Sequence, residues 1–497
     1  MMSFLAQDLF YAVRQLRKSP GFTVAAVLTL ALGIGANLSV FLILYGVLLR
    51  PLPFPHPQQL VRINRFYFGD HMVPAYSGTK ALFMSRTSRT LESAAAYDYI
   101  PSHVNLLQGN QVVPLEAVRV TSDFFHVFQM EPRIGRGFSA ADMVPNAAGV
   151  AVLSDATWRQ QFAADPSILG RSITLGNKPY TVIGVANPTF RLDAKVDVWT
   201  PLQITESPDD QSNSYNFIGR LKPGVTRAQA EDDLKRVLLQ LRTTYPDLWD
   251  RQESVRVQDL HESFVGDIAP ALKMLMGAVG LVLVIVAANI LSLLLTRSIA
   301  RQREMSLRAA LGASGWRILR QLLVENAVLC VLGGILGAVL AEFATPMLMQ
   351  LSPLPLPQFA SLRIGGPALV FAAALMLGCA LLFSLVPTLE SRRTQLNESL
   401  RVNSTQVAGG RNFAQKSLVV GEVAVSLVLL VAAGLLLTSF WKLIHVSPGF
   451  DSANVLTFKT SFTDEQAATS AALGQRMDEL VARLEAQPGV ESAAAVN

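Results

Sequence analysis

The chain has 497 residues, of which 51% are hydrophobic and only 16% are charged, and its formal net charge is +5. This composition excludes an ordinary soluble protein and indicates membrane helices. The net charge is positive, but the sequence has no basic patch with interleaved aromatic residues, so we expect no nucleic-acid partner. The two cysteines, Cys330 and Cys379, both fall in apolar runs, so the polar part of the chain has no disulfide framework.

Residues 1–20 are expected to form a cytoplasmic amphipathic helix on the inner membrane surface. Apolar residues at helical spacing share one face, whereas the charged residues lie elsewhere. Residues 21–49 then predict the first membrane span, because this uncharged run exceeds the roughly 20 residues that cross a hydrocarbon core. The run is too long for the apolar region of a cleaved signal peptide.

Residues 50–270 follow a soluble pattern and predict an α+β domain outside the cytoplasm. Strands are expected at Leu60–Asn64, Val112–Val120, Val150–Leu153, Ser172–Leu175 and Tyr180–Val185. Helices are expected at Asp155–Ala164 and Arg227–Thr244, the second with Thr226 as its N-cap.

Further apolar runs predict a bundle of about five membrane helices in total. The later spans are expected at 271–296, 321–349, 366–389 and 417–441, with an external loop at 350–365. Basic residues concentrate in 1–20, 297–320 and 390–416, so these segments and the N-terminus are expected to face the cytoplasm. This predicts a multi-pass protein of the cell (inner) membrane, in contact with the lipid bilayer.

The segment 297–320 is a short basic loop between two spans. It is typical of a helix that ends at Gly312, with Leu307 and Leu311 on one face. Such a loop would give a cytoplasmic partner a compact helical binding site that is connected to two membrane helices. An ordinary positive-inside loop could also contain R-x-R-E followed by a Gly-Ala turn, and this alternative stays open.

The run from Arg303 to Glu325 closely resembles the cytoplasmic loop of FtsX-like and MacB-like ABC permeases. Motifs of the polar domain are similar to the MacB-type extracytoplasmic domain: Ser122–Phe125, Gly135–Phe138, Tyr180–Val185, Asp197–Leu202 and Gly219–Thr226. The resemblance implies two lobes in that domain, with a smaller β-rich insert at about 147–210. It also implies that the loop acts as a coupling helix docked on a cytoplasmic ABC ATPase.

The resemblance assigns an ATPase-coupling surface to Arg301, Arg303, Glu304, Arg308, Gly312 and Arg317. The arginines could pair with acidic groups on the ATPase, and Gly312 would end the helix. A second set of residues, Gly33, Gly35, Gly333, Gly334 and Gly337, permits close helix contact. This contact lies either within the bundle or between two permease halves, and we favour the second.

Polar residues within the predicted spans are Asn37, Asn289, Glu325, Asn326 and Glu342. We expect Glu325 to pair with Arg320 and Asn289 to hydrogen-bond a neighbouring helix. The five residues are too dispersed to form a proton relay.

Catalytic patterns are mostly missing from the sequence. There is no P-loop pattern, and the histidines are scattered without metal-ligand spacing. Residues 77–80 match S-x-x-K, but the companion motifs are missing, so we interpret them as an external turn. We therefore expect no catalytic residue, metal or bound cofactor in this chain, and ATP hydrolysis in a partner subunit.

The last part of the chain resembles the duplicated orphan permeases of the same superfamily, cut short. Residues 390–416 predict a cytoplasmic linker, and 442–497 predict the start of a second external domain. Within it we expect a strand at Val455–Thr460, a helix at Asp464–Ala486 and a new strand from Val490.

These expectations converge on a permease subunit of the MacB/FtsX type, which acts in export or mechanotransmission. A membrane-anchored scaffold or regulator that binds extracytoplasmic proteins without transport is the alternative.

Overall fold

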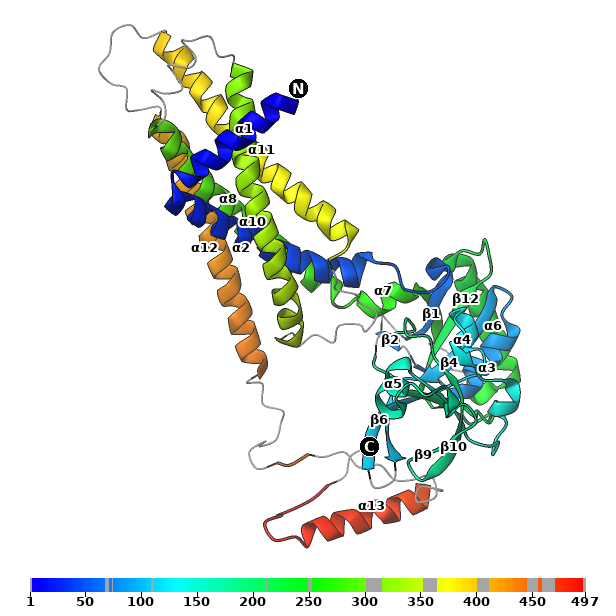
Figure 1. Ribbon diagram of the computed structural model, residues 1–497. Helices are drawn as coiled ribbons and strands as arrows, with labels where there is room; N and C mark the ends of the chain where they lie inside the picture. Colours follow the sequence, from blue (N-terminus) through cyan, green and yellow to red (C-terminus); the bar gives the residue numbers. More distant parts are fainter. Residues whose placement is uncertain are drawn as a thin grey trace. The chain divides into compact units, whose positions relative to one another are not determined.

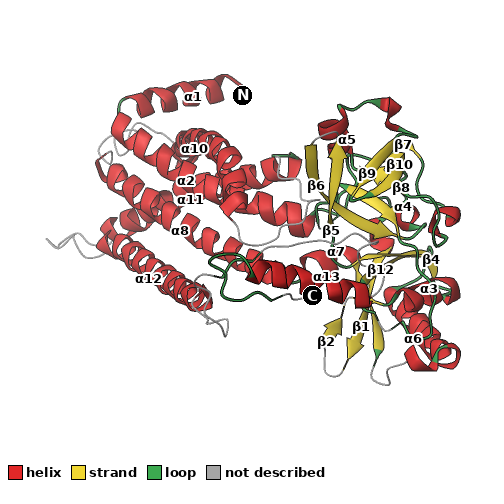
Figure 2. Cartoon of the chain, turned by 90° about the horizontal axis from the view of Figure 1, so that it is seen from below, coloured by secondary structure: helices red, strands yellow, loops and turns green. Residues whose placement is uncertain are grey.

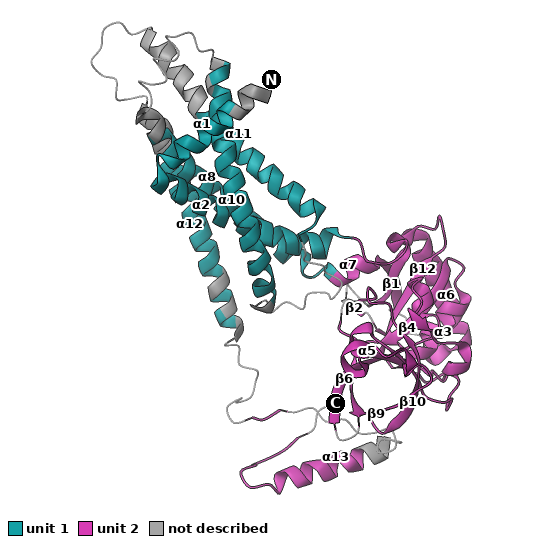
Figure 3. Ribbon diagram, viewed as in Figure 1, with its two compact units in different colours: residues 1–50, 265–450 teal, residues 51–264, 451–497 magenta. Residues whose placement is uncertain are grey.

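The computed structural model describes residues 2–67, 71–73, 75–108, 111–192, 194–210, 212–248, 253–300, 315–351, 364–399, 411–444, 455–457 and 470–494. The chain separates into two compact units (Figure 3). The helical unit comprises residues 1–50 and 265–450, and the α+β unit comprises 51–264 and 451–497. The strands that the structure describes all belong to the second unit (Figure 2).

The helical unit consists of long helices (Figure 1). They are α1 (Met2–Arg17), α2 (Pro20–Leu44), α8 (Ala269–Ala300), α10 (Gly315–Leu351), α11 (Gly366–Ser399) and α12 (Arg411–Ile444). Among the described residues, four helical stretches are long and apolar enough to cross a membrane: Pro20–Leu49, Ala269–Thr296, Leu319–Met349 and Gly366–Val386. The stretch Val419–Leu435 of α12, expected as the fifth span, is apolar but shorter.

The first membrane helix begins with Pro20, which suits the first helical position because its missing N–H would have no partner there. Beyond α2 the chain continues as a π-helical turn, η1 (Tyr45–Leu49). The helix α2 packs against α8 and α10, and α10 also packs against α11. Leu30, Ile34 and Ile290 are among the residues that fill the apolar core between these helices.

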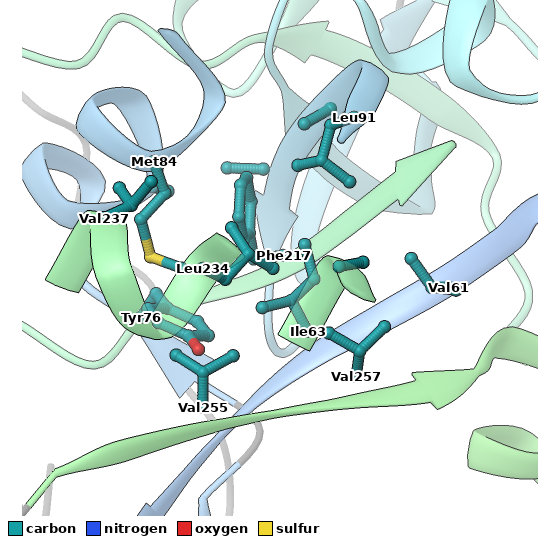
Figure 4. Close-up of a cluster of buried hydrophobic side chains, with 14 of the residues drawn as sticks. Val61, Ile63, Tyr76, Met84, Leu91, Phe217, Leu234, Val237, Val255 and Val257 are labelled. Carbon is teal, nitrogen blue, oxygen red and sulfur yellow. The ribbon is translucent and has the colours of Figure 1, made fainter. Parts of the chain in front are cut away.

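The larger lobe of the α+β unit is an antiparallel sheet in the order β4–β12–β1–β13. Its strands are β1 (Leu60–Tyr67), β4 (Leu91–Asp98), β12 (Tyr215–Leu221) and β13 (Ser254–Asp259), and its helices are α3 (Gly78–Thr87) and α6 (Arg227–Thr244). The chain order β1–α3–β4 and β12–α6–β13 is that of a split βαβ fold. Figure 4 shows side chains of both helices meeting those of the strands in one apolar core.

The smaller lobe is a closed ring of strands in the order β5–β6–β11–β8–β10–β9, because β9 pairs back with β5. The strands are β5 (Ser102–Gln108), β6 (Gln111–Val120), β8 (Val150–Leu153), β9 (Ser172–Leu175), β10 (Lys178–Val185) and β11 (Val198–Pro201). This ring is inserted between β4 and β12. Its core takes Leu106 and Leu115 from β5 and β6, so the insert starts earlier than the expected range 147–210.

Short elements complete the unit. They are β2 (His71–Val73), β3 (Ala75–Tyr76), β7 (Ile134–Gly135), α4 (Phe124–Val127), α5 (Asp155–Phe162), α7 (Leu260–Val265) and α13 (Ser470–Glu485). The predicted bounds of β8, β9 and α6 are confirmed, and Thr226 forms a capping box with Gln229 at the start of α6. Residues 455–457 and 490–494 form no strand, although strands were expected there, and 458–469 lie outside the described residues.

Asp142 holds a turn of the inserted part of the chain. Its carboxylate accepts hydrogen bonds from the Ser139 backbone and hydroxyl and pairs with Arg136 at 2.7 Å. The Arg136 hydrogen bond lowers the pKa of Asp142 from its ordinary value to about 2, despite opposing desolvation. A depressed pKa stabilises the fold above the unfolded-state pKa of about 4, and the stabilisation is lost as pH falls toward the folded-state pKa.

We therefore expect Asp142→Asn to weaken this turn at pH 7 but much less below the folded-state pKa of about 2, where the native carboxyl also becomes protonated. Hydrogen exchange of the 139–143 backbone, corrected for the intrinsic rate at each pH, would measure the difference. A variant that differs from the native protein equally at both pH values would contradict the prediction.

Candidate functional site

The expected coupling surface lies mostly outside the described residues. Residues 301–314 are not described, so nothing tests the roles of Arg301, Arg303, Glu304, Arg308 and Gly312. Arg317 lies near the start of α10, where its side chain is exposed. The assignment of these residues to the coupling surface stays a prediction.

Helices α2 and α10 approach each other backbone to backbone at Gly35 and Gly337. A Cβ atom on Gly35 would lie 2.9 Å from the Gly337 carbonyl oxygen. A Cβ on Gly337 would lie 3.0 Å from both the Ala31 carbonyl oxygen and the Gly35 nitrogen. Both glycines are therefore needed for backbone-to-backbone contact of the kind that small residues permit between membrane helices.

The other three glycines also contact helices of the same chain. A Cβ on Gly33 would meet Val286 of α8 at 3.0 Å, and one on Gly333 would meet Leu30 of α2 at 2.6 Å. Gly334 faces Met376 of α11. Our preference for contacts between two permease halves is therefore wrong for these glycines, because neighbouring helices of this chain already occupy the space that they leave.

Buried amides link the apolar helices. Asn37 of α2 donates to the Gly33 carbonyl and, at 3.0 Å, to the Val279 carbonyl of α8. Asn326 of α10 donates to the Ser384 hydroxyl of α11 at 3.0 Å. The sequence assigned this linking role to Asn289, which is exposed in the structure. An uncharged amide can bridge membrane helices because it satisfies its donors without burying a charge.

Arg320 forms an ion pair that the sequence did not predict. Its Nε lies 2.8 Å from Asp8 Oδ2, which ties α10 to the amphipathic helix α1. Glu325, the expected partner, is buried on α10, and Glu342 is exposed. Sequence spacing could not predict the pair with Asp8, because it does not show that α1 packs against α10. The expected pairing of Arg320 with Glu325 stays a prediction.

The S-x-x-K residues begin helix α3 and do not form the turn that we expected. The Ser77 hydroxyl accepts the Lys80 backbone N–H at 3.3 Å as an N-cap. The Lys80 ammonium is buried and lies 2.6 Å from Glu253, with Arg65 on the other carboxylate oxygen at 3.8 Å. The lysine is thus held in a structural ion pair.

Arg220 of β12 is a buried residue whose role the sequence did not reveal, and its side chain is 0% exposed. Its Nε donates to the Val127 carbonyl at 2.7 Å, and Nη2 donates to the Pro55 carbonyl at 3.1 Å. Nη1 donates to the His56 carbonyl and the Gln59 side chain. Burial lowers the pKa of Arg220 from its ordinary value. In the sequence, Arg220 stood out only as part of the Gly219–Thr226 motif, which is similar to the MacB-type domain.

Phe54 lies beside the segment that Arg220 holds. Its ring is 4.6 Å from Phe128 and 5.6 Å from Phe190, measured between centroids. These rings belong to a buried aromatic cluster that also contains Phe124, Phe125 and Trp199. Residues 51–59, which follow the first membrane helix, are therefore fastened to the α+β unit by both apolar and polar contacts.

Comparison with known proteins shows similarity to two protein families. Residues 23–237 match the MacB-like periplasmic core domain, and residues 276–396 match the FtsX-like permease C-terminal family. The macrolide export ATP-binding/permease protein MacB of Salmonella typhi is 30% identical over 261 residues, which are 51% of this chain and 39% of that protein. The MacB protein of Escherichia coli strain K12 is 29% identical over 255 residues, 50% of this chain and 38% of that protein.

Solved structures give weaker matches. The periplasmic region of MacB from Actinobacillus actinomycetemcomitans matches with a TM-score of 0.31 and 16% identity, covering 45% of this chain and 95% of that structure. A domain of a permease protein from Porphyromonas gingivalis matches with a TM-score of 0.33 and 17% identity, covering 41% of this chain and 92% of that structure.

The long apolar helices and the folded α+β unit define a membrane protein with an extracytoplasmic domain. The chain belongs to the MacB/FtsX-like permease family, because matches to two of its domains cover both units. It spans about two fifths of the length of the curated relatives that it matches.

Proposed function

We propose that this chain is the permease subunit of an ABC transporter in the cell membrane, with its N-terminus in the cytoplasm. A separate cytoplasmic ATPase would hydrolyse ATP and drive movement of the extracytoplasmic domain, for export or for mechanical signalling. The FtsX-like match over residues 276–396 carries this proposal, because it includes the basic loop and the spans on both sides of it. No cofactor is proposed for the chain itself.

The helix contacts support this mechanism. Residues 301–314 connect α8 to α10 in the sequence, and both helices pack directly on α2. Close-packed helices transmit displacement because their interior has little free volume. A push on this connecting segment by the ATPase would therefore move α2, which leads through residues 50–59 into the extracytoplasmic domain.

Affinity purification from native membranes tests the proposal. The intact chain is compared with a variant in which residues 301–316 are replaced by a neutral helix, and co-purifying proteins are identified by mass spectrometry. We expect a soluble ATPase with the intact chain only. Recovery of extracytoplasmic proteins in both preparations without any ATPase would instead favour the scaffold function.

Exchange of Glu304 for lysine is expected to uncouple ATP hydrolysis from output. Reversing one charge on a helical docking surface should weaken coupling on the order of tenfold, because like charges then face each other or a pairing is lost. The ratio of output to ATP hydrolysed by the reconstituted pair would be measured. Glu491→Lys, at an exposed residue of the α+β unit, is the charge-matched control. Unchanged coupling in Glu304→Lys would remove this residue from the coupling surface.

A further inference from the structure

Residues 51–59 connect the outer end of the first membrane helix to the α+β unit, and two side chains hold this connection. We propose that Arg220 and Phe54 form an anchor through which displacement of α2 enters both lobes of the extracytoplasmic domain. The transmission part of this inference rests on the proposed function. The anchor itself stands on the geometry of the α+β unit alone.

The Arg220 guanidinium is fully buried, and its recorded partners are three backbone carbonyls and one amide oxygen. A buried charge is costly unless its donors are satisfied, so release of this segment would leave an unsolvated cation behind. The partners come from separate parts of the chain: Val127, and the segment 55–59. Arg220 therefore acts as a cross-link between backbone segments that are far apart in the sequence.

The backbone beside these carbonyls adopts unusual conformations. His56 has a φ of 46° and Gln129 has a φ of 50°, both in the left-handed region that residues other than glycine rarely adopt. His56 offers its own carbonyl to Arg220, and Gln129 lies two residues after Val127. Such conformations persist when surrounding contacts determine them. The Arg220 bonds supply such contacts to His56 itself and to Val127, two residues before Gln129.

The anchor reaches both lobes. Arg220 is on β12, a central strand of the larger lobe, between β4 and β1. Val127 ends α4, and Phe128 and Phe190 also belong to the chain inserted between β4 and β12. Phe190 in turn contacts Trp199 of β11, a strand of the smaller lobe. A displacement that arrives along residues 50–54 therefore acts on the sheet through Arg220 and on the inserted part through Phe54. Without the anchor, the same displacement would stretch the 51–59 connection.

The first experiment tests, in the absence of nucleotide, whether Arg220 restricts the position of residues 51–59 relative to the rest of the α+β unit. Spin labels are placed at Pro53→Cys and Leu239→Cys, both exposed sites of the α+β unit, in the full chain with Cys330 and Cys379 changed to alanine. With Arg220 present we expect a narrow distance distribution. With Arg220→Met we expect a distribution about twofold broader, because the 51–59 connection is released.

The control is Arg86→Met, which removes an exposed arginine paired with Glu206 and should leave the distribution narrow. If Arg220→Met does not fold, Gln59→Ala and Phe54→Ala remove one acceptor and one ring and should each broaden the distribution. A distribution as narrow as that of the parent in every folded variant would overturn the anchor.

The second experiment tests transmission in the complex with the co-purified ATPase. Hydrogen exchange of both lobes is compared with and without ATP. We expect ATP-dependent changes in the parent that are lost in Arg220→Met, or in Gln59→Ala if the former does not fold, while ATP hydrolysis continues. Changes that persist in a variant with a broadened distribution would overturn transmission through the anchor. A parent without any ATP-dependent change would instead contradict the proposed function and leave the anchor result standing.

Discussion

Exchange of Gly337 for leucine is expected to disrupt the helical unit. The new side chain would start 3.0 Å from the Ala31 carbonyl oxygen and the Gly35 nitrogen, which are backbone atoms of α2. A flexible side chain could rotate aside, but a helix backbone must shift as a whole. Overpacking costs about 1–3 kcal/mol, and contact against backbone should lie at or above the upper end of that range. The unfolding midpoint of the helical unit should fall on the order of 10 °C.

Thermal unfolding of the purified protein in detergent, followed by size-exclusion chromatography, would measure this effect. Gly280→Leu is the matched control, because no atom lies within 4 Å of a Cβ at that position of α8. Equal midpoints for the two variants would show that the α2–α10 contact does not determine stability. Gly337→Ala should fall between them, because it adds only the Cβ atom.

Exchange of Glu253 for glutamine is expected to destabilise the α+β unit by about 3–5 kcal/mol. The carboxylate is 1% exposed, and it faces Lys80 at 2.6 Å and Arg65 at 3.8 Å. The neutral amide would leave two cations in a nearly dry environment without their anion. Loss of one partner of a buried pair costs more than the pair contributes, because the remaining charge stays desolvated.

Hydrogen-exchange protection of α3 and β13 would measure this loss of stability. Glu206→Gln removes the carboxylate of the exposed pair with Arg86 and should cost only about 0–1 kcal/mol. The double variant Lys80→Met/Glu253→Gln should recover part of the stability, since only Arg65 then lacks its anion. A Glu253→Gln protein as stable as Glu206→Gln would show that water reaches this cluster.

Local patterns predicted much of the secondary structure. A short continuous apolar run located β8, alternating apolar residues located β9, and the Thr226 cap with the apolar spacing of Ala230, Leu234 and Val237 located α6. Uncharged runs located the membrane helices, because a span must be continuous in the sequence. These features depend on neighbouring residues, so they can be seen without the fold.

Contacts between distant segments could not be predicted in the same way. The partners of Arg220 lie 93 to 165 residues away, and Lys80 and Glu253 are 173 residues apart. The smaller lobe was expected to begin near residue 147, yet its ring closes only with β5 and β6, which precede that boundary. Strand pairing decides the boundary of a lobe, and the sequence pattern of a strand does not show which other strand it pairs with.

The sequence by itself determined a membrane protein with apolar helices, an α+β domain and a basic segment between two spans, because hydrophobicity, charge and helix signals act over short stretches of chain. The tertiary structure alone decided where the five glycines make contact and which carbonyls hold Arg220. It also decided that Lys80 serves an ion pair with Glu253. A glycine shows that close approach is possible, and a charge shows that a partner is needed. Which helix packs against the glycine, and which group pairs with the charge, depends on segments that only folding brings together.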